Sequence, residues 1–316
     1  MPSHPKRHHY LPESYLRRFT REKGFWVYDI ESGQFRPQSP NGTGVKGYFN
    51  ALEDKDGNRS FVIEEALSEI EGATAQVMLK IEAREKLSDE ERHTLAHFVG
   101  LQMLRGPDFH EDVNKMNDKF MRLFTEHMFA DRDRAEKKWN KADAELGGTS
   151  GVSFDDAKKF IEKGEYTIKT HRNRTLELML ELAPDFANIF LRLDWMVLCA
   201  PPNKSFVTCD RPFSIVPPRD RKLSPFRGVG IATKGAWKLM PLSMSRCLVM
   251  ADPGSVCAYT DCDMNGVRQT NLNICHGANR FVIGCERELV DSLVNEIQQV
   301  HSERGIKWGG SRLVVG

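Results

Sequence analysis

Three acidic residues and two histidines have side chains that can bind a divalent metal ion or transfer protons: Glu64, Glu71, Asp210, His8 and His9. Carboxylate oxygens are the usual ligands of such ions, and imidazole exchanges protons near neutral pH. Glu64 and Glu71 lie seven residues apart, about two helical turns, so they share one side of a helix. We expect Glu64 and Glu71 to hold a metal ion, and His8, His9 and Asp210 to act in catalysis.

Each of these expectations has a structural alternative. Two adjacent residues of an extended backbone point to opposite faces, so at most one of His8 and His9 faces a shared site. Glutamates on a helix flank commonly form ion pairs in solvent, which is the alternative for Glu64 and Glu71. An Asp one residue before an X-Pro turn, as at Asp210, is also an ordinary turn former.

A second set of residues has the chemistry to bind a phosphate-bearing substrate. An arginine holds phosphate through paired N–H donors, which suits Arg17 and Arg105. Gln102 places an amide in an otherwise apolar helical stripe, where its donors and acceptor need partners. The alternative is that Gln102 bonds the backbone and Arg105 pairs with a structural glutamate. The residues expected to bind substrate are Tyr10, Arg17, Gln102, Arg105 and Asn271.

The charge of the chain limits what it can bind. Lys and Arg number 45 against 44 Asp and Glu, so the whole molecule lacks the basic field of a non-specific nucleic-acid binder. The opening segment, residues 5–19, is a local exception in which basic residues and histidines outnumber acids. We expect a phosphate-bearing ligand or nucleic acid to bind there. Neither a P-loop nor a G-x-S-x-G motif occurs, so the common nucleotide and hydrolase signatures are missing.

Apolar periodicity predicts an α+β protein. A β-hairpin is expected over residues 25–36, and helices are expected from residue 60 onward, including one that begins at the capping box Ser88-Asp-Glu-Glu91. The N-terminal half is therefore expected to be mainly helical with a small hairpin. Short β-type runs after residue 193 predict a mixed or antiparallel sheet with helices in the C-terminal half.

The glycine-rich stretch 146–151 marks a seam, which divides the chain into residues 1–145 and 146–316. One continuous domain is the alternative. The chain shows neither a signal peptide nor an apolar run long enough to span a membrane, so we expect a cytoplasmic protein with no membrane partner. Its 7 cysteines lack C-x-x-C pairs and are expected to be reduced.

The opening run Lys6-Arg-His-His-Tyr-Leu-Pro-Glu-Ser-Tyr-Leu-Arg-Arg-Phe19 resembles the signature of an uncharacterised bacterial family known only as a domain of unknown function. Further pieces agree in order along most of the chain: Glu64 with Glu71, Gln102 with Arg105 and Pro107, Asp210 with Pro212, Pro241-Leu242-Ser243, and Asn271. The family's Ser-Asp-Asn-Pro turn appears here as Cys209-Asp210-Arg211-Pro212, which keeps Asp210. The resemblance implies these positions and no reaction.

Two functions follow from these residues. The first is a metal-assisted hydrolase that acts on a phosphate-containing substrate, a nucleic acid or nucleotide, with a divalent metal ion held by the acidic residues. The second is a non-catalytic binding or regulatory protein, in which the same polar cluster locks the opening segment onto the helices.

Overall fold

The computed structural model describes residues 6–22, 24–145, 147, 151–218, 229–252, 258–305 and 307–309. It contains both helices and strands, which confirms the predicted α+β class. The chain forms two compact units, the first of Met1–Asp108 with Leu176–Gly316 and the second of Phe109–Thr175. The seam predicted over 146–151 includes residues outside the described part of the chain, and the units are divided at other positions.

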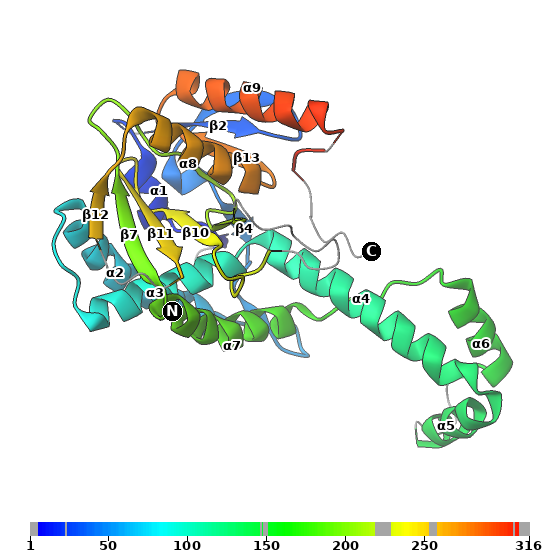
Figure 1. Ribbon diagram of the computed structural model, residues 1–316. Coiled ribbons are helices and arrows are strands. Elements are labelled where there is room, and N and C mark those ends of the chain that lie inside the picture. Colours follow the sequence, from blue (N-terminus) through cyan, green and yellow to red (C-terminus); the bar gives the residue numbers. More distant parts are fainter. Residues whose placement is uncertain are drawn as a thin grey trace. The chain divides into compact units, whose positions relative to one another are not determined.

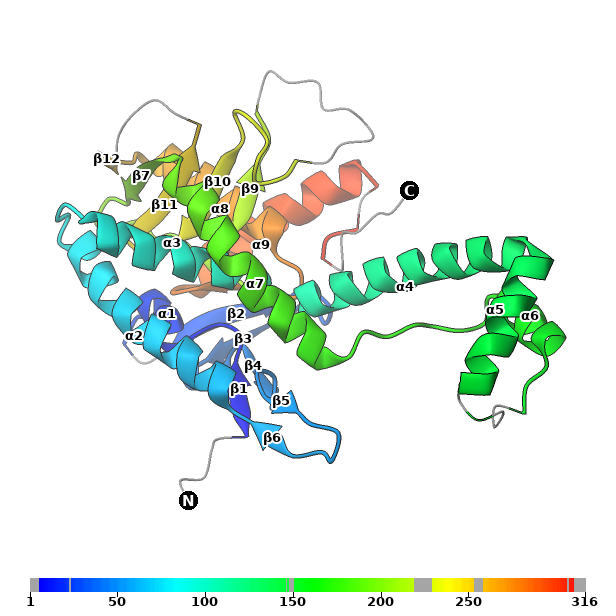
Figure 2. The ribbon, with the colours of Figure 1, turned by 90° about the horizontal axis from the view of Figure 1, so that it is seen from below.

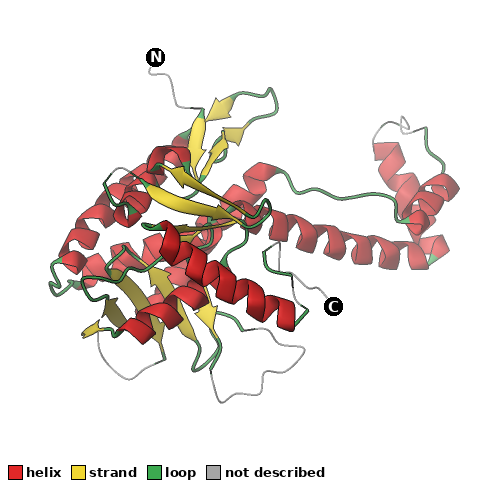
Figure 3. Ribbon diagram, turned by 90° about the horizontal axis from the view of Figure 1, so that it is seen from above, coloured by secondary structure: helices red, strands yellow, loops and turns green. Residues whose placement is uncertain are grey.

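In the first unit, an antiparallel sheet joins the two ends of the chain. Its order is β3-β2-β13-β8. The strands are β2 (Phe25–Asp29), β3 (Gln34–Gln38), β8 (Thr208–Cys209) and β13 (Phe281–Gly284). The predicted hairpin is thus confirmed as β2 and β3, but β13, from about 250 residues later, lies beside it. Figure 3 shows the strands gathered in separate sheets among the helices.

The second sheet of this unit is mixed, with the order β12-β7-β11-β10-β9. Its strands are β7 (Asp194–Cys199), β9 (Ser214–Val216), β10 (Trp237–Pro241), β11 (Arg246–Ala251) and β12 (Ala258–Asp261). Only β12 runs parallel to its neighbour β7. Two short ladders precede the helices and pair β1 (Arg7–His9) with β4 (Val45–Gly47), and β5 (Leu52–Glu53) with β6 (Arg59–Ser60). The N-terminal half is therefore mixed, with strands first, and the expectation of a mainly helical half was too simple.

Helices cover both sheets. They are α2 (Val62–Glu82), α3 (Asp89–Leu104), α7 (Arg172–Leu191), α8 (Met264–Gly277) and α9 (Arg287–Glu303). Helices α2 and α3 lie side by side (Figure 1). The capping box at Ser88 is confirmed: its hydroxyl accepts from the N–H of Glu91 at 3.2 Å, and the Glu91 carboxylate accepts from the N–H of Ser88 at 2.8 Å.

Helices α3 and α7 cross closely (Figure 2). A Cβ added at Gly100 of α3 would lie 2.8 Å from the carbonyl oxygen of Ala183 in α7, so only glycine allows this approach. Pro184 follows immediately, and α7 continues through it, although the sequence predicts a kink or break there.

The opening segment is a docked element of the core. Pro12 precedes α1 (Glu13–Leu16), which runs into the 3₁₀ helix η1 (Arg17–Phe19); a further 3₁₀ turn is η2 (Pro40–Gly42). The Tyr15 hydroxyl donates to the carbonyl oxygen of Pro241 in β10 at 2.9 Å and accepts from Thr208 in β8 at 2.7 Å. One buried phenol of α1 therefore bridges the two sheets. The fully buried apolar residues of the segment are Leu11, Tyr15, Leu16 and Phe19.

The second unit is helical. It contains nearly all of α4 (Pro107–Ala130), together with α5 (Arg132–Glu145) and α6 (Phe154–Lys163). Ser153 caps α6 by accepting from the N–H of Asp156 at 3.1 Å, and Phe129 of α4 stacks on Phe154. Within the described residues of either unit, every helix is too short or too polar to cross a membrane.

Candidate functional site

Asp210 occupies the turn directly after β8 and is almost completely buried. Its carboxylate accepts three backbone N–H groups from the chain that enters β13: Asn279 at 3.0 Å, Arg280 at 3.0 Å and Phe281 at 3.3 Å. Burial raises the pKa of Asp210 to about 6, and the Asp108 carboxylate adds to the rise, whereas the three N–H donors oppose it. The carboxyl can therefore gain or lose a proton near neutral pH.

Tyr10 adds a phenol beside this carboxyl. It follows β1, and its ring is buried against Phe49. Burial raises the pKa of Tyr10, the negative charge of Asp210 adds to the rise, and the exposed cation of Arg280 opposes it. The hydroxyl makes no hydrogen bond with the described residues of the chain. A protonated phenol without a partner remains available to donate a hydrogen bond to a ligand.

Asp108 and Arg211 complete the group. The Arg211 Nε lies 2.6 Å from the carboxylate of Asp108. The Arg211 side chain is 33% exposed, and the Asp108 side chain is buried. Asp108 affects the pKa of both Asp210 and Tyr10, which places it close to both. We call Tyr10, Asp108, Asp210, Arg211 and Arg280 the Tyr10–Asp210 site.

Asp108 lies in the first turn of α4, three residues after Arg105, the C-cap of α3. Its carboxylate folds back against Gly106, so a side chain at that position would clash with it. One turn earlier, Gln102 is buried, and within the described structure neither its carboxamide oxygen nor its nitrogen has a hydrogen-bond partner. Such unsatisfied buried groups are uncommon and mark a place where water or a ligand can bind.

Arg105 itself is held by Glu71 of α2, to which it donates a hydrogen bond. Arg105 is only 2% exposed, so the two charges form a largely desolvated pair. The structure therefore places Glu71 and Arg105 in the arrangement that the structural alternative describes.

His8 and Glu64 meet in a separate network. The backbone N–H of Asn50 donates to His8 Nδ1 at 3.1 Å, and the Asn50 side chain donates to Glu64 at 2.6 Å. His8 Nδ1 also lies 3.4 Å from the carboxylate of Glu64. His8 is fully buried and His9 half-buried, in keeping with the alternation along β1.

Glu64 and Glu71, which were expected to hold a metal ion, and Asp210, which was expected to act in catalysis, have separate partners. Glu64 is bound by Asn50, Glu71 by Arg105, and Asp210 by backbone N–H groups. Among the residues that the structure describes, no group of three or more His, Cys, Asp or Glu side chains is arranged to hold a metal ion. The described side chains therefore do not fit the expected metal site.

Arg17 of the opening segment is 69% exposed and pairs with Glu13. Arg21 pairs with Glu286, and Arg18 donates to the carbonyl oxygen of Ala75 at 3.1 Å.

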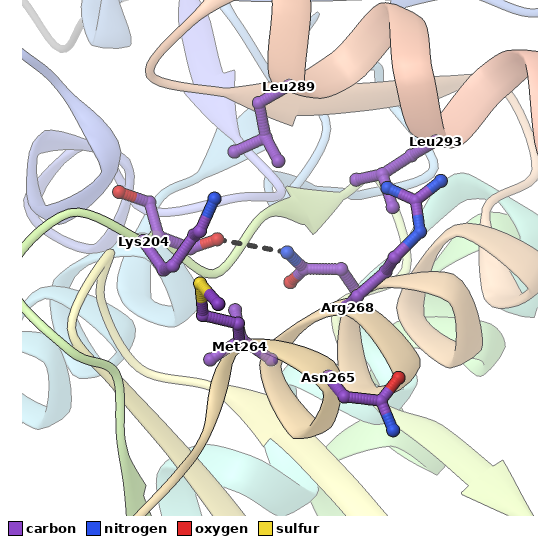
Figure 4. A pocket seen from close by; sticks show the side chains of 9 residues that line it. Lys204, Met264, Asn265, Arg268, Leu289 and Leu293 are labelled. Carbon is purple, nitrogen blue, oxygen red and sulfur yellow. Dashed lines mark hydrogen bonds between the residues drawn. The ribbon is translucent and has the colours of Figure 1, made fainter.

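Asn271 lies apart from the Tyr10–Asp210 site, in the lining of a pocket of about 300 Å³ between α8 and α9 (Figure 4). Its amide accepts from the N–H of Val207 at 3.0 Å and donates to the carbonyl oxygen of Ser205 at 2.9 Å. Both bonds fix the strand-like segment before β8. In Figure 4, Lys204 and Arg268 stand on opposite sides of the pocket, and Arg268 is already paired with Glu296.

Fold and site together define an α+β protein with a buried carboxyl and phenol flanked by arginines. The chain belongs to the family described as a protein of unknown function, DUF4238, whose profile matches residues 7–288. The match covers every residue of the Tyr10–Asp210 site. It confirms the expected membership of a domain-of-unknown-function family. No curated protein and no solved structure significantly matches the chain.

Sequence reasoning selected Tyr10 and Asp210 but missed Asp108, Arg211 and Arg280. Asp108 directly follows Gly106-Pro107, a pair that predicts the end of a helix and no functional role. Arg211 occupies a position where this chain departs from the family's turn, so the resemblance drew attention away from it. Arg280 carries no local signal, because only the pairing of β13 with β8 brings it to Asp210.

Proposed function

We propose that the protein is a hydrolase that acts on a phosphate-containing substrate, a nucleotide or nucleic acid, at the Tyr10–Asp210 site. One observation carries the proposal: Asp210 is a buried carboxyl with its pKa raised to about 6, beside a phenol and two arginines. Titratable groups with strongly shifted pKa values cluster at functional sites.

The side chains of the site suit the steps of phosphate-ester hydrolysis. Water oxygen bonds to phosphorus while the bond from phosphorus to the leaving oxygen breaks. Ionised Asp210 accepts the proton of the water and returns it to the leaving oxygen. Tyr10 donates a hydrogen bond to a phosphoryl oxygen, and Arg211 and Arg280 supply cationic N–H donors to the developing negative charge. A guanidinium has five N–H donors, so Arg211 can contact both Asp108 and a substrate.

No step of this proposal passes through a metal ion. The sequence predicted a divalent cation at Glu64 and Glu71, and the described contacts of both residues are with other protein groups. If an ion contributes, the substrate phosphate is the group that would bring it.

The proposal is tested by assaying the full chain on a panel of nucleotides, oligonucleotides and aryl phosphates, as wild type and as Tyr10→Phe. We expect wild-type turnover on at least one substrate and a loss of about 100-fold or more in Tyr10→Phe, with unchanged thermal stability, because the removed hydroxyl bonds nothing in the described structure. Tyr28→Phe is the matched control: this buried phenol bonds Gln298 at 2.7 Å and should keep full turnover. Equal turnover in Tyr10→Phe and Tyr28→Phe would overturn the proposal.

A second candidate is a non-catalytic binding or regulatory protein. The buried Arg105–Glu71 pair, which ties α3 to α2, and the His8–Asn50–Glu64 network, which ties the opening segment to α2, favour it. Buried polar networks of this kind commonly hold a fold together. This candidate gains support if no substrate of the panel is turned over and a phosphate-bearing ligand still binds.

We also propose a cytoplasmic location. The free thiols support it, because a reduced state is typical of that compartment. The cysteines found free are Cys199, Cys209, Cys247, Cys262, Cys275 and Cys285.

A further inference from the structure

One face of α4, in the second unit, exposes large apolar side chains. The exposed fractions are 57% for Met116, 64% for Phe120, 57% for Leu123 and 49% for Phe124. Spacings of four, three and one residue place these side chains on one side of the helix. We call these four residues the α4 stripe. Soluble proteins seldom leave contiguous apolar patches of this kind uncovered.

The α4 stripe is large enough to form the centre of a protein interface. Aromatic and other large side chains present about 150–250 Å² each, so four that are half-exposed offer about 400 Å² on one copy. Pairing two copies removes about 800 Å² from water before flanking residues are counted, and stable interfaces bury about 1,200–2,000 Å² in total. The polar residues along a helix of 24 residues can supply the remainder as a rim.

The charged residues beside the α4 stripe are complementary to the same residues of a second copy in the antiparallel orientation. Lys119 and Glu126 are both exposed and lie seven residues apart, about two turns, on the same edge of α4. Neither forms an ion pair with the residues that the structure describes. A two-fold axis midway between them would set Lys119 against the partner's Glu126 twice. The same axis passes between Phe120 and Phe124, so it also lays the α4 stripe on its own copy.

We propose that two copies of this chain pair through the α4 stripe, with their α4 helices antiparallel about a two-fold axis. Apolar packing supplies most of the affinity, and the reciprocal Lys119–Glu126 contacts set the direction and register. The proposal concerns assembly and is independent of the hydrolase assignment.

Sedimentation of the full chain over a range of concentrations tests this pairing. We expect a wild-type dimer, and a monomer at about 100 µM for Phe120→Asp. Phe160→Asp is the matched control, since Phe160 is 55% exposed in the same unit but lies on α6, and it should leave the dimer intact. A wild-type monomer at that concentration, or a dimer that survives Phe120→Asp, overturns the proposal.

A charge exchange tests the antiparallel register. Lys119→Glu should raise the dissociation constant of the dimer about tenfold or more, because it sets like charges together twice. Adding Glu126→Lys in the same chain restores opposite charges, so the double variant should return to within about threefold of wild type. The losses of dimerisation free energy in Lys119→Glu and in Glu126→Lys alone are then compared with the loss in the double variant. If the loss in the double variant equals their sum, these residues do not face each other. Circular dichroism of each variant separates loss of pairing from loss of folding.

Discussion

At the scale of single residues, the balance between burial and hydrogen bonding at Asp210 decides what the site can do. Three backbone N–H donors stabilise the ionised carboxylate, but removal from water and the nearby Asp108 destabilise it more, so the pKa rises to about 6. Asp29 is as little exposed as Asp210, and burial also raises its pKa, but hydrogen bonds from Ser32 and the cations of Arg36 and Arg280 outweigh burial and lower it. The charge of the neighbouring side chains, cationic at Asp29 and anionic at Asp210, therefore separates the two aspartates.

This shift predicts a pH dependence of stability. An aspartate in the unfolded chain ionises near pH 3.8, whereas Asp210 in the fold ionises near pH 6. Between these values only the folded state holds the proton, so the contribution of Asp210 to the free energy of unfolding falls as pH rises from 4 to 6 and is constant above. The whole change is about 3 kcal/mol.

Urea unfolding of wild type and Asp210→Asn at pH 4, 5, 6 and 7 measures this change. Asparagine keeps the shape and one acceptor oxygen but cannot ionise, so the difference in free energy of unfolding between the two proteins should shift by about 2 kcal/mol in favour of Asp210→Asn between pH 4 and 7. A difference that does not vary with pH would mean that Asp210 ionises at its ordinary pKa.

At the scale of elements, the contact between α2 and α3 holds one of the few buried charges of the fold. Arg105, at the C-terminal cap of α3, is 2% exposed and depends on Glu71 for its counter-charge. The pair of Glu13 on α1 with Arg17 of η1 has the same chemistry, but its arginine is 69% exposed. Removing the glutamate should therefore lower the free energy of unfolding more at the Glu71–Arg105 pair, where the arginine stays buried, than at the Glu13–Arg17 pair.

Glu71→Gln should therefore lower the free energy of unfolding by about 1–3 kcal/mol, because a neutral amide leaves the Arg105 charge uncompensated. Glu13→Gln, the control at the exposed pair, should leave the free energy of unfolding unchanged within error. Chemical denaturation of both variants gives the comparison. Equal stability of Glu71→Gln and wild type would exclude a structural role for the Glu71–Arg105 pair.

Local signals predicted the elements well where the chain determines its own conformation. The Ser88 capping box, the hairpin of β2 and β3 and the apolar face of α9 are each contained in one short stretch of sequence. Such signals do not report which element lies beside which. The sequence predicted a kink or break at Pro184, and the break does not occur, because α7 continues through that residue. Strands β1, β4, β5 and β6 were hidden in loop-like composition, although they pair with one another within the opening 60 residues.

At the scale of the whole molecule, the first unit is closed by its two ends, and the candidate site depends on that closure. Tyr10 comes from the opening segment, Asp210 from the middle of the chain and Arg280 from the approach to β13. Antiparallel pairing of β13 with β8 brings the last two together. The types of Tyr10 and Asp210 could be selected from the sequence, but their cation partners could not, because long-range pairing alone places them.

The central claim is that Asp210 exchanges a proton during hydrolysis of a phosphate-containing substrate. The most direct test is the pH dependence of kcat/KM for wild type and Asp210→Asn on the best substrate of the panel. The wild-type value should rise through an inflection near pH 6 as Asp210 ionises, and Asp210→Asn should lose about 100-fold or more and the inflection with it. Wild-type rates and the same inflection in a folded Asp210→Asn protein would contradict the claim.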